Sequence, residues 1–235
     1  MAANAQLGAA HEKQPRFVAV SVDLEHAGPW RLLFPHALRL MQHLEEQFPQ
    51  LAWTFGGGTV LMLRIRHRRS KDIDLFVPDP QYLGYVNPRL SEVAEQVSQE
   101  YQEGAEFLKL FLSEGEIDIV VGTPLTNRPF EMVSHAGIGI RVETCGEIIA
   151  KKMWHRGDQA KARDLYDLCA VADAEPKAID EAAPFLARHG AAFLSGLERR
   201  AGLMEAEFEA IDAIGTPRSF AQSLAQAHAI ILPLL

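Results

Sequence analysis

Residues 55–76 read FGGGTVLMLRIRHRRSKDIDLF, and the interpretation of the whole chain starts from this stretch. It begins with three glycines, continues with apolar residues at helical spacing, and ends on an Asp-Ile-Asp run at 72–74. This order predicts a glycine turn, a helix from 59 to about 66 with Thr59 at its start, and a strand over 73–77. Side chains at i and i+2 of a strand point from the same face, so the two carboxylates are expected to converge.

Two converging carboxylates favour a cation between them. Asp72 and Asp74 would repel each other without one, and hard oxygen ligands beside phosphates favour Mg²⁺. The backbone N–H groups of a glycine turn that opens a helix suit phosphate oxygens. Taken singly, an Asp-x-Asp can be a solvated strand end and three glycines an ordinary turn. Their combination in this order predicts a metal-dependent nucleotidyl-transfer site.

A third carboxylate stands in a later apolar strand. Residues 107–112 and 117–121 are predicted to form a hairpin around a turn at 113–116, and the second strand is apolar except for Asp118. A charge in such a strand is costly unless it is paired or bound to a metal. Asp118 either faces water at a sheet edge or joins Asp72 and Asp74, and the second interpretation is preferred.

The composition limits the class of protein. The chain has 235 residues, 48% of them hydrophobic, so we expect one large domain or a core with an appendage. A net charge of −8 argues against a general nucleic-acid binder, although basic residues cluster at 64–71. That cluster is either a solvated helix end or a rim that attracts an anionic substrate.

The sequence gives no sign of a secreted or membrane protein. Only Cys145 and Cys169 occur, too few for a disulfide scaffold and without metal-ligand spacing. The first residues lack a signal-peptide pattern, and the apolar ending IILPLL is too short to span a bilayer. We therefore expect a soluble, cytoplasmic protein with no membrane partner.

The remaining elements follow from periodicity and from Gly and Pro positions. Expected before the Asp-x-Asp strand are a disordered leader over 1–15, a helix over 29–48 that could instead begin at Pro35, and a strand over 51–55. Expected after it are a helix over 90–101, a connection over 123–137, a strand over 139–143 and helices over 146–155, 160–174, 176–189, 191–213 and 218–232. The domain prediction is a leader over 1–15, a catalytic core over 16–144 and a helical region over 145–235.

A second group of charged residues lies in the helical region, in EIIAKKM (147–153) and KARDLYDL (161–168). One interpretation is a surface ion pair between Arg163 and Asp167 at i, i+4. The other is that a lysine contacts nucleotide phosphates while an acidic residue orients that lysine or the acceptor.

Together, the glycine–Asp-x-Asp stretch, the lone Asp118 and the motif EIIAKKM…RDLYDL resemble the abortive-infection nucleotidyltransferase toxins of the AbiEii/AbiGii type. The resemblance covers about residues 50–170. It implies an α/β (α+β) fold: a DNA-polymerase-β-like nucleotidyltransferase core with a mixed sheet, followed by a helical region. It also implies the toxin of a toxin–antitoxin pair, with a cognate antitoxin as partner.

The resemblance also assigns roles to individual residues. It implies NTP-phosphate binding by Gly57, Gly58 and Thr59, Mg²⁺ binding by Asp72, Asp74 and Asp118, and a lysine-and-acid motif at Lys152, Arg163, Asp164 and Asp167. Lys151 is the alternative for the motif's lysine. The expected catalytic residues are Asp72, Asp74, Asp118, Lys152 and Asp164.

The predicted reaction moves NMP from an NTP to a macromolecular acceptor and releases pyrophosphate. An RNA 3′ end, such as that of tRNA, is the favoured acceptor, and a protein hydroxyl is the alternative. Two competing interpretations are a sugar-nucleotide glycosyltransferase, which can also use Asp-x-Asp, and a degenerate fold that serves only as an interaction module.

Overall fold

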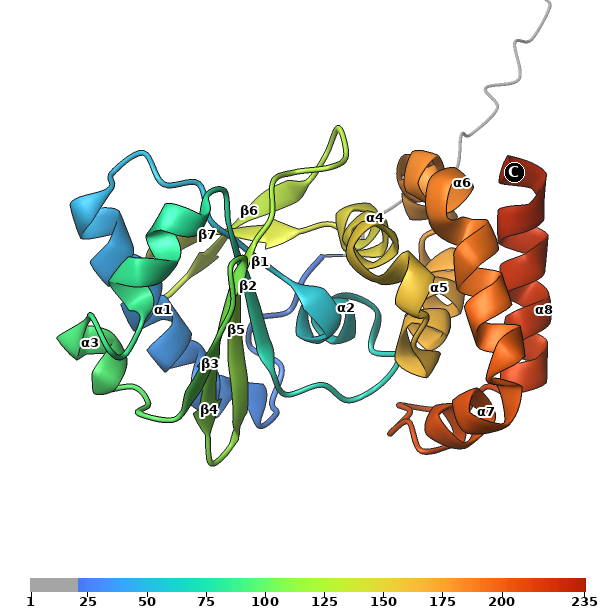
Figure 1. Ribbon diagram of the computed structural model, residues 1–235, viewed down its shortest axis with the longest axis horizontal. Coiled ribbons are helices and arrows are strands. Elements are labelled where there is room, and N and C mark those ends of the chain that lie inside the picture. Colours follow the sequence, from blue (N-terminus) through green and yellow to red (C-terminus); the bar gives the residue numbers. More distant parts are fainter. Residues whose placement is uncertain (1–20) are drawn as a thin grey trace, which may run out of the picture.

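A mixed seven-stranded sheet forms the centre of the N-terminal part of the molecule (Figure 1). The computed structural model describes residues 21–235, so the predicted leader over 1–15 lies outside the described residues. The strand order is β3-β4-β5-β2-β1-β7-β6. The strands are β1 Thr54–Gly56, β2 Ile73–Val77, β3 Tyr101–Glu103, β4 Phe107–Leu112, β5 Gly115–Val121, β6 Phe130–His135 and β7 Ile138–Glu143.

The two faces of the sheet have different environments. On β2, Ile73, Leu75 and Val77 are fully buried on the side of α1 (Trp30–Gln47). The alternate residues, Asp74 and Phe76, are only partly buried and project to the opposite side. This alternation follows from the two-residue period of a strand, and it places the predicted carboxylates on the face away from α1.

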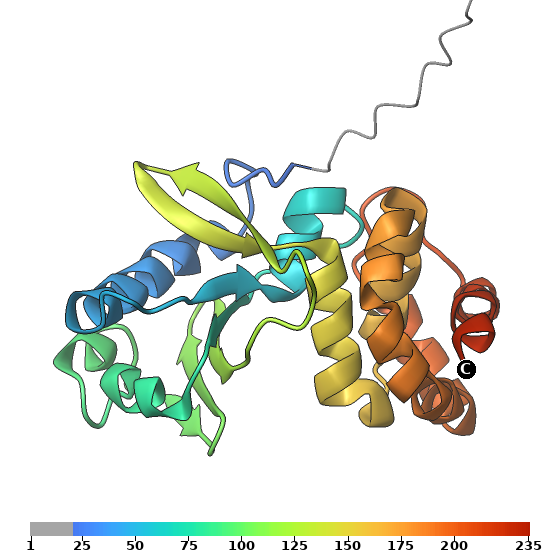
Figure 2. The same ribbon diagram turned by 90° about the horizontal axis from the view of Figure 1, so that it is seen from above.

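Helices flank the sheet on both sides. α1 and the one-turn α3 (Glu92–Glu95) lie on one side, and α2 (Gly57–Ile65) lies on the other (Figure 1). All elements after β7 are helical: α4 Cys145–Arg156, α5 Ala162–Ala174, α6 Pro176–Arg199, α7 Ala201–Glu209 and α8 Phe220–Ile231. Seen from above, α4 lies between the sheet and the later helices (Figure 2).

Short 3-10 helices complete the description. They span Pro80–Val86, Gly157–Gln159 and Leu232–Leu234. Among the helices of residues 21–235, none is long and apolar enough to cross a membrane.

The hairpin and the Asp-x-Asp strand are confirmed, but two predicted elements before α4 are wrong. The helix expected over 90–101 is reduced to the single turn of α3. The Ser98 hydroxyl bonds to the backbone of Glu100 and Phe111 and turns the chain into β3, which pairs with β4. The connection expected over 123–137 contains β6, which pairs with β7 at the sheet edge. Its sequence, FEMVSH, is half polar and does not alternate strictly, so it gives little strand periodicity.

Several helix boundaries also differ from the prediction, and the helix expected over 191–213 is divided between the end of α6 and α7. α2 begins at Gly57 rather than Thr59. α6 continues through Gly190, where a helix break was expected. A Cβ at Gly190 would lie 2.3 Å from Ile231 Cγ2, so this glycine permits α8 to pack closely against α6. Its role in packing explains why a residue that usually ends helices stands inside one.

Candidate active site

One side chain from each of three neighbouring strands forms a row across the sheet. Asp74 on β2 is in register with Asp118 on β5, which is in register with Lys109 on β4. On the other side of Asp74 stands Gly56 of β1. Because paired residues in a sheet lie on the same face, the fold brings Asp74 and Asp118 together although 44 positions separate them in the sequence.

The surroundings of Asp74 and Asp118 disfavour the ionised forms of both carboxyl groups. Burial, and then the charge of Asp74, raises the pKa of Asp118 to about 6, against the opposing effect of Lys109. Burial also raises the pKa of Asp74, and the charge of Asp72 adds to that effect. The Lys109 ammonium lies 3.2 Å from Asp118 Oδ1 and also contacts Glu116. Lys109 therefore does not fully offset the cost of ionising Asp118, and the charges of Lys152, Arg156 and Arg163 do not fully offset that of Asp74.

Asp72 is placed by its backbone as well as its side chain. Its Oδ1 accepts a hydrogen bond of 3.1 Å from the Glu116 backbone N–H. Its carbonyl oxygen accepts one of 2.5 Å from the hydroxyl of Thr59, which is fully buried and also lies 3.0 Å from Ser70 Oγ. Thr59 thus holds the segment that carries Asp72 and does not line the cavity, where phosphate binding had been expected of it.

The glycine turn fits closely over the carboxylates. Gly57 has a φ of +73°, and a Cβ there would lie 1.9 Å from Asp74 Oδ2, so both conformation and space require glycine. A Cβ at Gly58 would lie 2.7 Å from Arg68 Nη2. The first turn of α2 therefore lies directly beside Asp74 and the Arg68 guanidinium, where its free N–H groups suit an anion.

The helical region contributes a buried ionic cluster. Lys152 Nζ lies 2.5 Å from Asp164 Oδ1 and 2.9 Å from Asp167 Oδ2. Asp167 also accepts hydrogen bonds from Arg68 Nε at 2.6 Å and Nη2 at 2.9 Å, and lies 2.7 Å from His67 Nε2. Although burial raises the pKa of Asp167, the charges of Lys152 and Arg68 outweigh it and hold that pKa well below its usual range.

This cluster separates the predicted residues into two groups. Lys152 lines the cavity, whereas Asp164 and Asp167 are buried behind it and do not. Asp164 also accepts a hydrogen bond of 3.1 Å from Arg156, one turn beyond Lys152 on α4. The surface pair between Arg163 and Asp167 is wrong: Arg163 is exposed and lines the cavity, while Asp167 is fully buried against other partners.

Both lysines of α4 face the cavity, so the choice between Lys151 and Lys152 was too narrow. Lys151 Nζ lies 2.5 Å from Glu143 Oε1 and 3.7 Å from the centre of the Phe76 ring. Glu143 Oε1 also accepts a hydrogen bond of 2.6 Å from the Thr54 hydroxyl. Glu143 was not predicted as a site residue. It ends β7, which also contains Arg141, so it lacks the signal of a lone charge in an apolar strand that marked Asp118.

The basic run at 64–71 does not form the expected rim. Arg64 is buried and bonds to Glu131 and to the carbonyl of Glu143. Arg66 pairs with Asp23 at 2.8 Å, and Arg69 lies 3.6 Å from Asp212. Of the basic residues in this run, Arg68 alone lines the cavity, so the run serves mainly to join neighbouring segments.

A cavity of about 550 Å³ connects the sheet face with the helical region. Of the predicted site residues, it is lined by Gly57, Gly58, Asp72, Asp74, Asp118, Lys152 and Arg163. Its other charged or polar lining residues are Arg68, Ser70, Lys109, Glu116, Glu143, Lys151, His155, Arg156, Gln159 and Lys161. Acidic groups thus concentrate on the sheet, while most cations come from α4, α5 and Arg68.

The fit of a divalent cation differs among the three carboxylates. Asp72 and Asp74 provide hard oxygen donors at i and i+2. A cation between them would offset the electrostatic cost of burial and the mutual repulsion that raise the pKa of Asp74. Asp118 is instead turned to Lys109. Within residues 21–235, no three His, Cys, Asp or Glu side chains are arranged to hold a metal ion, so the expected three-carboxylate site is not formed in this conformation.

Comparisons with solved structures find remote similarities. JHP933 from Helicobacter pylori is 14% identical, with 91% of this chain and 93% of that chain covered and a TM-score of 0.48. The antibiotic-resistance factor ANT(2'')-Ia is 14% identical, with 74% and 98% covered and a TM-score of 0.47. ANT(2'')-Ia in complex with adenylyl-2''-tobramycin is 15% identical, with 66% and 98% covered and a TM-score of 0.44. These similarities do not identify a substrate or acceptor for this chain.

The comparison of sequences is more decisive. No curated protein matches the chain. A family model, described as the nucleotidyl transferase AbiEii toxin of type IV toxin–antitoxin systems, matches residues 39–229. That range includes β1 to β7, both charged clusters and the cavity between them. The chain therefore belongs to the AbiEii nucleotidyltransferase toxin family.

Proposed function

We propose that this nucleotidyltransferase transfers NMP from an NTP to the 3′-terminal hydroxyl of an RNA and releases pyrophosphate. The observation that carries the proposal is the register of Asp74 with Asp118 beside the first turn of α2, in a cavity that also holds Lys152 and Arg68. Acidic groups on one wall and cations on the other suit a triphosphate and a hydroxyl that must lose its proton.

We assign different steps of the reaction to different residues of the cavity. The N–H groups of the first turn of α2, with Lys152 and Arg68, bind the triphosphate. Asp164 and Asp167 orient Lys152, which matches the earlier hypothesis that an acidic residue positions the lysine. The acceptor oxygen attacks the α-phosphorus, the bond from that phosphorus to the bridging oxygen breaks, and pyrophosphate leaves. Asp118, whose pKa is about 6, accepts the hydroxyl proton.

Asp72 and Asp74 are the residues proposed to hold Mg²⁺. When bound, the ion supplies charge neutralisation for the triphosphate and for the developing oxyanion. The site was expected to include Asp118 as a third ligand, and that role requires Asp118 to leave Lys109. A magnesium titration followed by heat-induced unfolding tests this assignment, because a cation that binds only the native state raises its melting temperature.

The direct test uses each of the four NTPs, labelled at the α-phosphate, with separated RNA and protein fractions of a cell lysate. The proposal expects label on RNA with the wild-type protein and none with Asp74→Asn. Label on protein alone would replace RNA with a protein hydroxyl as acceptor. In parallel reactions with nucleotide sugars labelled in the sugar, label transferred from these alone would favour a glycosyltransferase, and no transfer from either kind of substrate would favour an interaction module.

We also propose that the chain acts as the toxin of its pair in the cytoplasm and that a cognate antitoxin counteracts it. The family supports this role. Induced expression should then arrest growth with the wild-type chain and not with Asp74→Asn at equal abundance. Growth arrest by both would show that toxicity does not depend on nucleotidyl transfer.

A further inference from the structure

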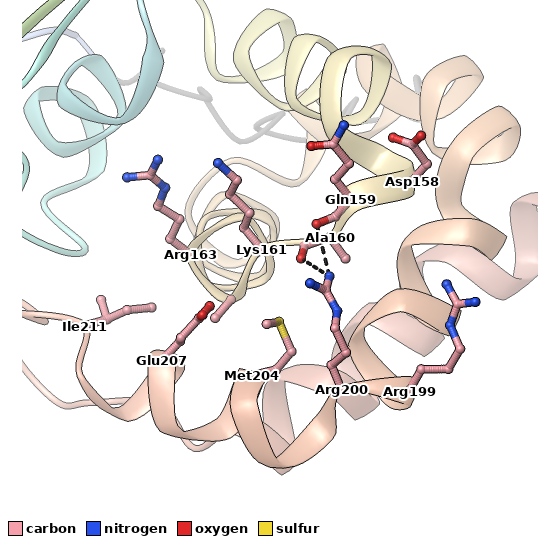
Figure 3. Close-up of a pocket in the computed structure, with 11 residues that line it drawn as sticks. Asp158, Gln159, Ala160, Lys161, Arg163, Arg199, Arg200, Met204, Glu207 and Ile211 are labelled. Carbon is pink, nitrogen blue, oxygen red and sulfur yellow. Dashed lines mark hydrogen bonds between the residues drawn. The ribbon is translucent and has the colours of Figure 1, made fainter.

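A second cavity, of about 750 Å³, lies beside the catalytic one (Figure 3). Its walls are the segment from 158 to 163, which joins α4 to α5, and the junction of α6 with α7. Its lining residues are Asp158, Gln159, Ala160, Lys161, Ala162, Arg163, Arg199, Arg200, Met204, Glu207 and Ile211. We call this the helical groove.

The helical groove is continuous with the catalytic cavity. Gln159, Lys161 and Arg163 line both. Figure 3 shows the side chains of these three residues projecting together away from α7, towards the side on which α2 and α4 lie. A ligand that reached Asp118 through this opening would therefore pass along Lys161 and Arg163 before it entered the catalytic cavity.

The charges in the helical groove are mostly positive. It holds four cations, Lys161, Arg163, Arg199 and Arg200, against the two acids Asp158 and Glu207. Arg200 is committed to the fold, because it donates hydrogen bonds to the carbonyl oxygens of Gln159 at 3.1 Å and Ala160 at 2.8 Å. The side chains of Lys161, Arg163 and Arg199 make no hydrogen bond or ion pair within the described residues.

The local environment of Lys161 shows that cations are crowded there. Burial lowers its pKa, and the charges of Arg156 and Arg163 lower it further. In a protein with a net charge of −8, such a concentration of unpaired cations is unusual and would be stabilised by an anionic ligand. Among residues 21–235, no aromatic side chain lines the groove, so we do not assign its binding to the stacking of bases.

We propose that the helical groove binds the sugar–phosphate backbone of the RNA acceptor and directs its 3′ end into the catalytic cavity. Phosphates are the anions that lysine and arginine contact without regard to base sequence. This inference rests on the nucleotidyl transfer proposed above. It assigns RNA binding to cations of the helical region instead of the basic run at 64–71. In that region, the side chains of Arg163 and Arg199 are available to contact a polyanion.

The experiment measures RNA binding directly, without turnover. A fluorescein-labelled RNA hairpin with a single-stranded 3′ tail is titrated with Arg199→Glu and with the matched control Arg89→Glu, at low and moderate salt. Both positions are exposed and both changes make the net charge two units more negative, but Arg89 lies near α3 at the opposite end of the molecule. Arg199 does not line the catalytic cavity, so the thermal shift produced by NTP should be unchanged.

The expected result is that Arg199→Glu weakens RNA binding by roughly 3–10-fold relative to Arg89→Glu and lowers the salt slope by about 0.7–0.9, the value for one phosphate contact. Equal RNA affinity and equal salt slope for the two variants would overturn the inference. Failure of the proposed function gives a different result. If the wild-type protein transfers no NMP but binds RNA through Arg199, the groove assignment holds and the proposed reaction is wrong. If NMP is transferred to protein alone and Arg199→Glu does not change RNA binding, nucleotidyl transfer holds and the groove assignment is wrong.

Discussion

Two groups of aspartates lie on opposite sides of the catalytic cavity, one lining it on the sheet and one buried behind Lys152, and their surroundings differ. On the sheet, Asp74 and Asp118 have raised pKa values. At Asp74, burial and the charge of Asp72 outweigh the charges of Lys152, Arg156 and Arg163. At Asp118, burial and the charge of Asp74 outweigh the charge of Lys109. In the helical region, Asp164 and Asp167 have lowered pKa values, because Lys152, Arg156 and Arg68 outweigh burial. For the same residue type, burial outweighs the nearby cations on the sheet, whereas the nearby cations outweigh burial in the helical region.

This difference indicates which carboxylates act and which support. A buried ion pair with good geometry has little to gain from a ligand, and breaking it leaves an uncompensated charge. Carboxylates that lack cations gain from a metal ion or a proton. We therefore assign Asp74 and Asp118 to the reaction, and Asp164 and Asp167 to the positioning of Lys152. Substitution of Asp74 should therefore lower turnover without lowering stability, whereas substitution of Asp167 should lower the free energy of unfolding.

The largest effect is expected at Asp74. Asp74→Asn should reduce turnover by about a thousandfold, since a metal ion contributes several kcal/mol and each 1.36 kcal/mol is tenfold in rate. In chelator, the variant should be at least as stable as wild type, because a buried carboxylate with a raised pKa is replaced by a neutral amide. Turnover is measured with labelled NTP and stability by urea unfolding. Wild-type turnover in a folded Asp74→Asn protein would refute the assignment.

The next effect concerns the helical cluster. Asp167→Asn should lower the free energy of unfolding by about 3–5 kcal/mol, because Lys152, Arg68 and His67 then lose their shared anion in the interior. Asp173→Asn is the control on the same helix. Asp173 pairs with Arg218 at the surface, so this variant should lose less than about 1 kcal/mol. Equal urea midpoints for the two variants would contradict the distinction drawn here.

A pH series sharpens the comparison further. Asp118 has a pKa of about 6, above the ordinary 3.8, so the native state binds more protons than the unfolded state between these values. Stability in chelator should therefore fall as pH rises from about 4 to 6, by about 1–3 kcal/mol for a partly solvated side chain. Asp118→Asn should reduce this fall and leave the part that comes from the raised pKa of Asp74. Asp167 acts in the opposite sense: its stabilisation is present above pH 4 and is lost as pH falls towards its lowered pKa.

The sheet side of the site was more predictable from sequence than the helical side. The two-residue period placed Asp72 and Asp74 on one face, and the cost of a charge in an apolar strand singled out Asp118. Both arguments use local rules. They could not predict that β2 and β5 would be neighbours in parallel register, or that Lys109 would neutralise Asp118, because strand pairing brings together residues that are distant in sequence.

The arrangement of the helical side of the site could not be predicted in the same way, because it depends on contacts between residues that are distant in sequence. Lys152 and Arg163, which were predicted as part of one motif, both line the cavity, but the interpretation that paired Asp167 with Arg163 chose the wrong arginine. The partner at i, i+4 was the local choice, whereas Arg68, 99 positions away, is the actual one. Lys151 and Glu143 show the same limit, since their pairing requires β7 and the first turns of α4 to be placed against β1. Arg156 could have been found, because it lies one helical turn after Lys152.

The smallest effect is expected where the basic run at 64–71 was thought to attract RNA. Arg66 and Arg69 are exposed and lie near Asp23 and Asp212, so replacing both with alanine should change the free energy of unfolding by less than about 1 kcal/mol. RNA affinity should change by less than about twofold, since their charge is already offset by these acids. The measurement is the same hairpin titration that tests Arg199. A loss of RNA affinity in this double variant larger than in Arg199→Glu would return the acceptor site to the basic run. Without such a loss, clustering of basic residues in sequence carries less information than the number of cations left without an acidic partner after folding.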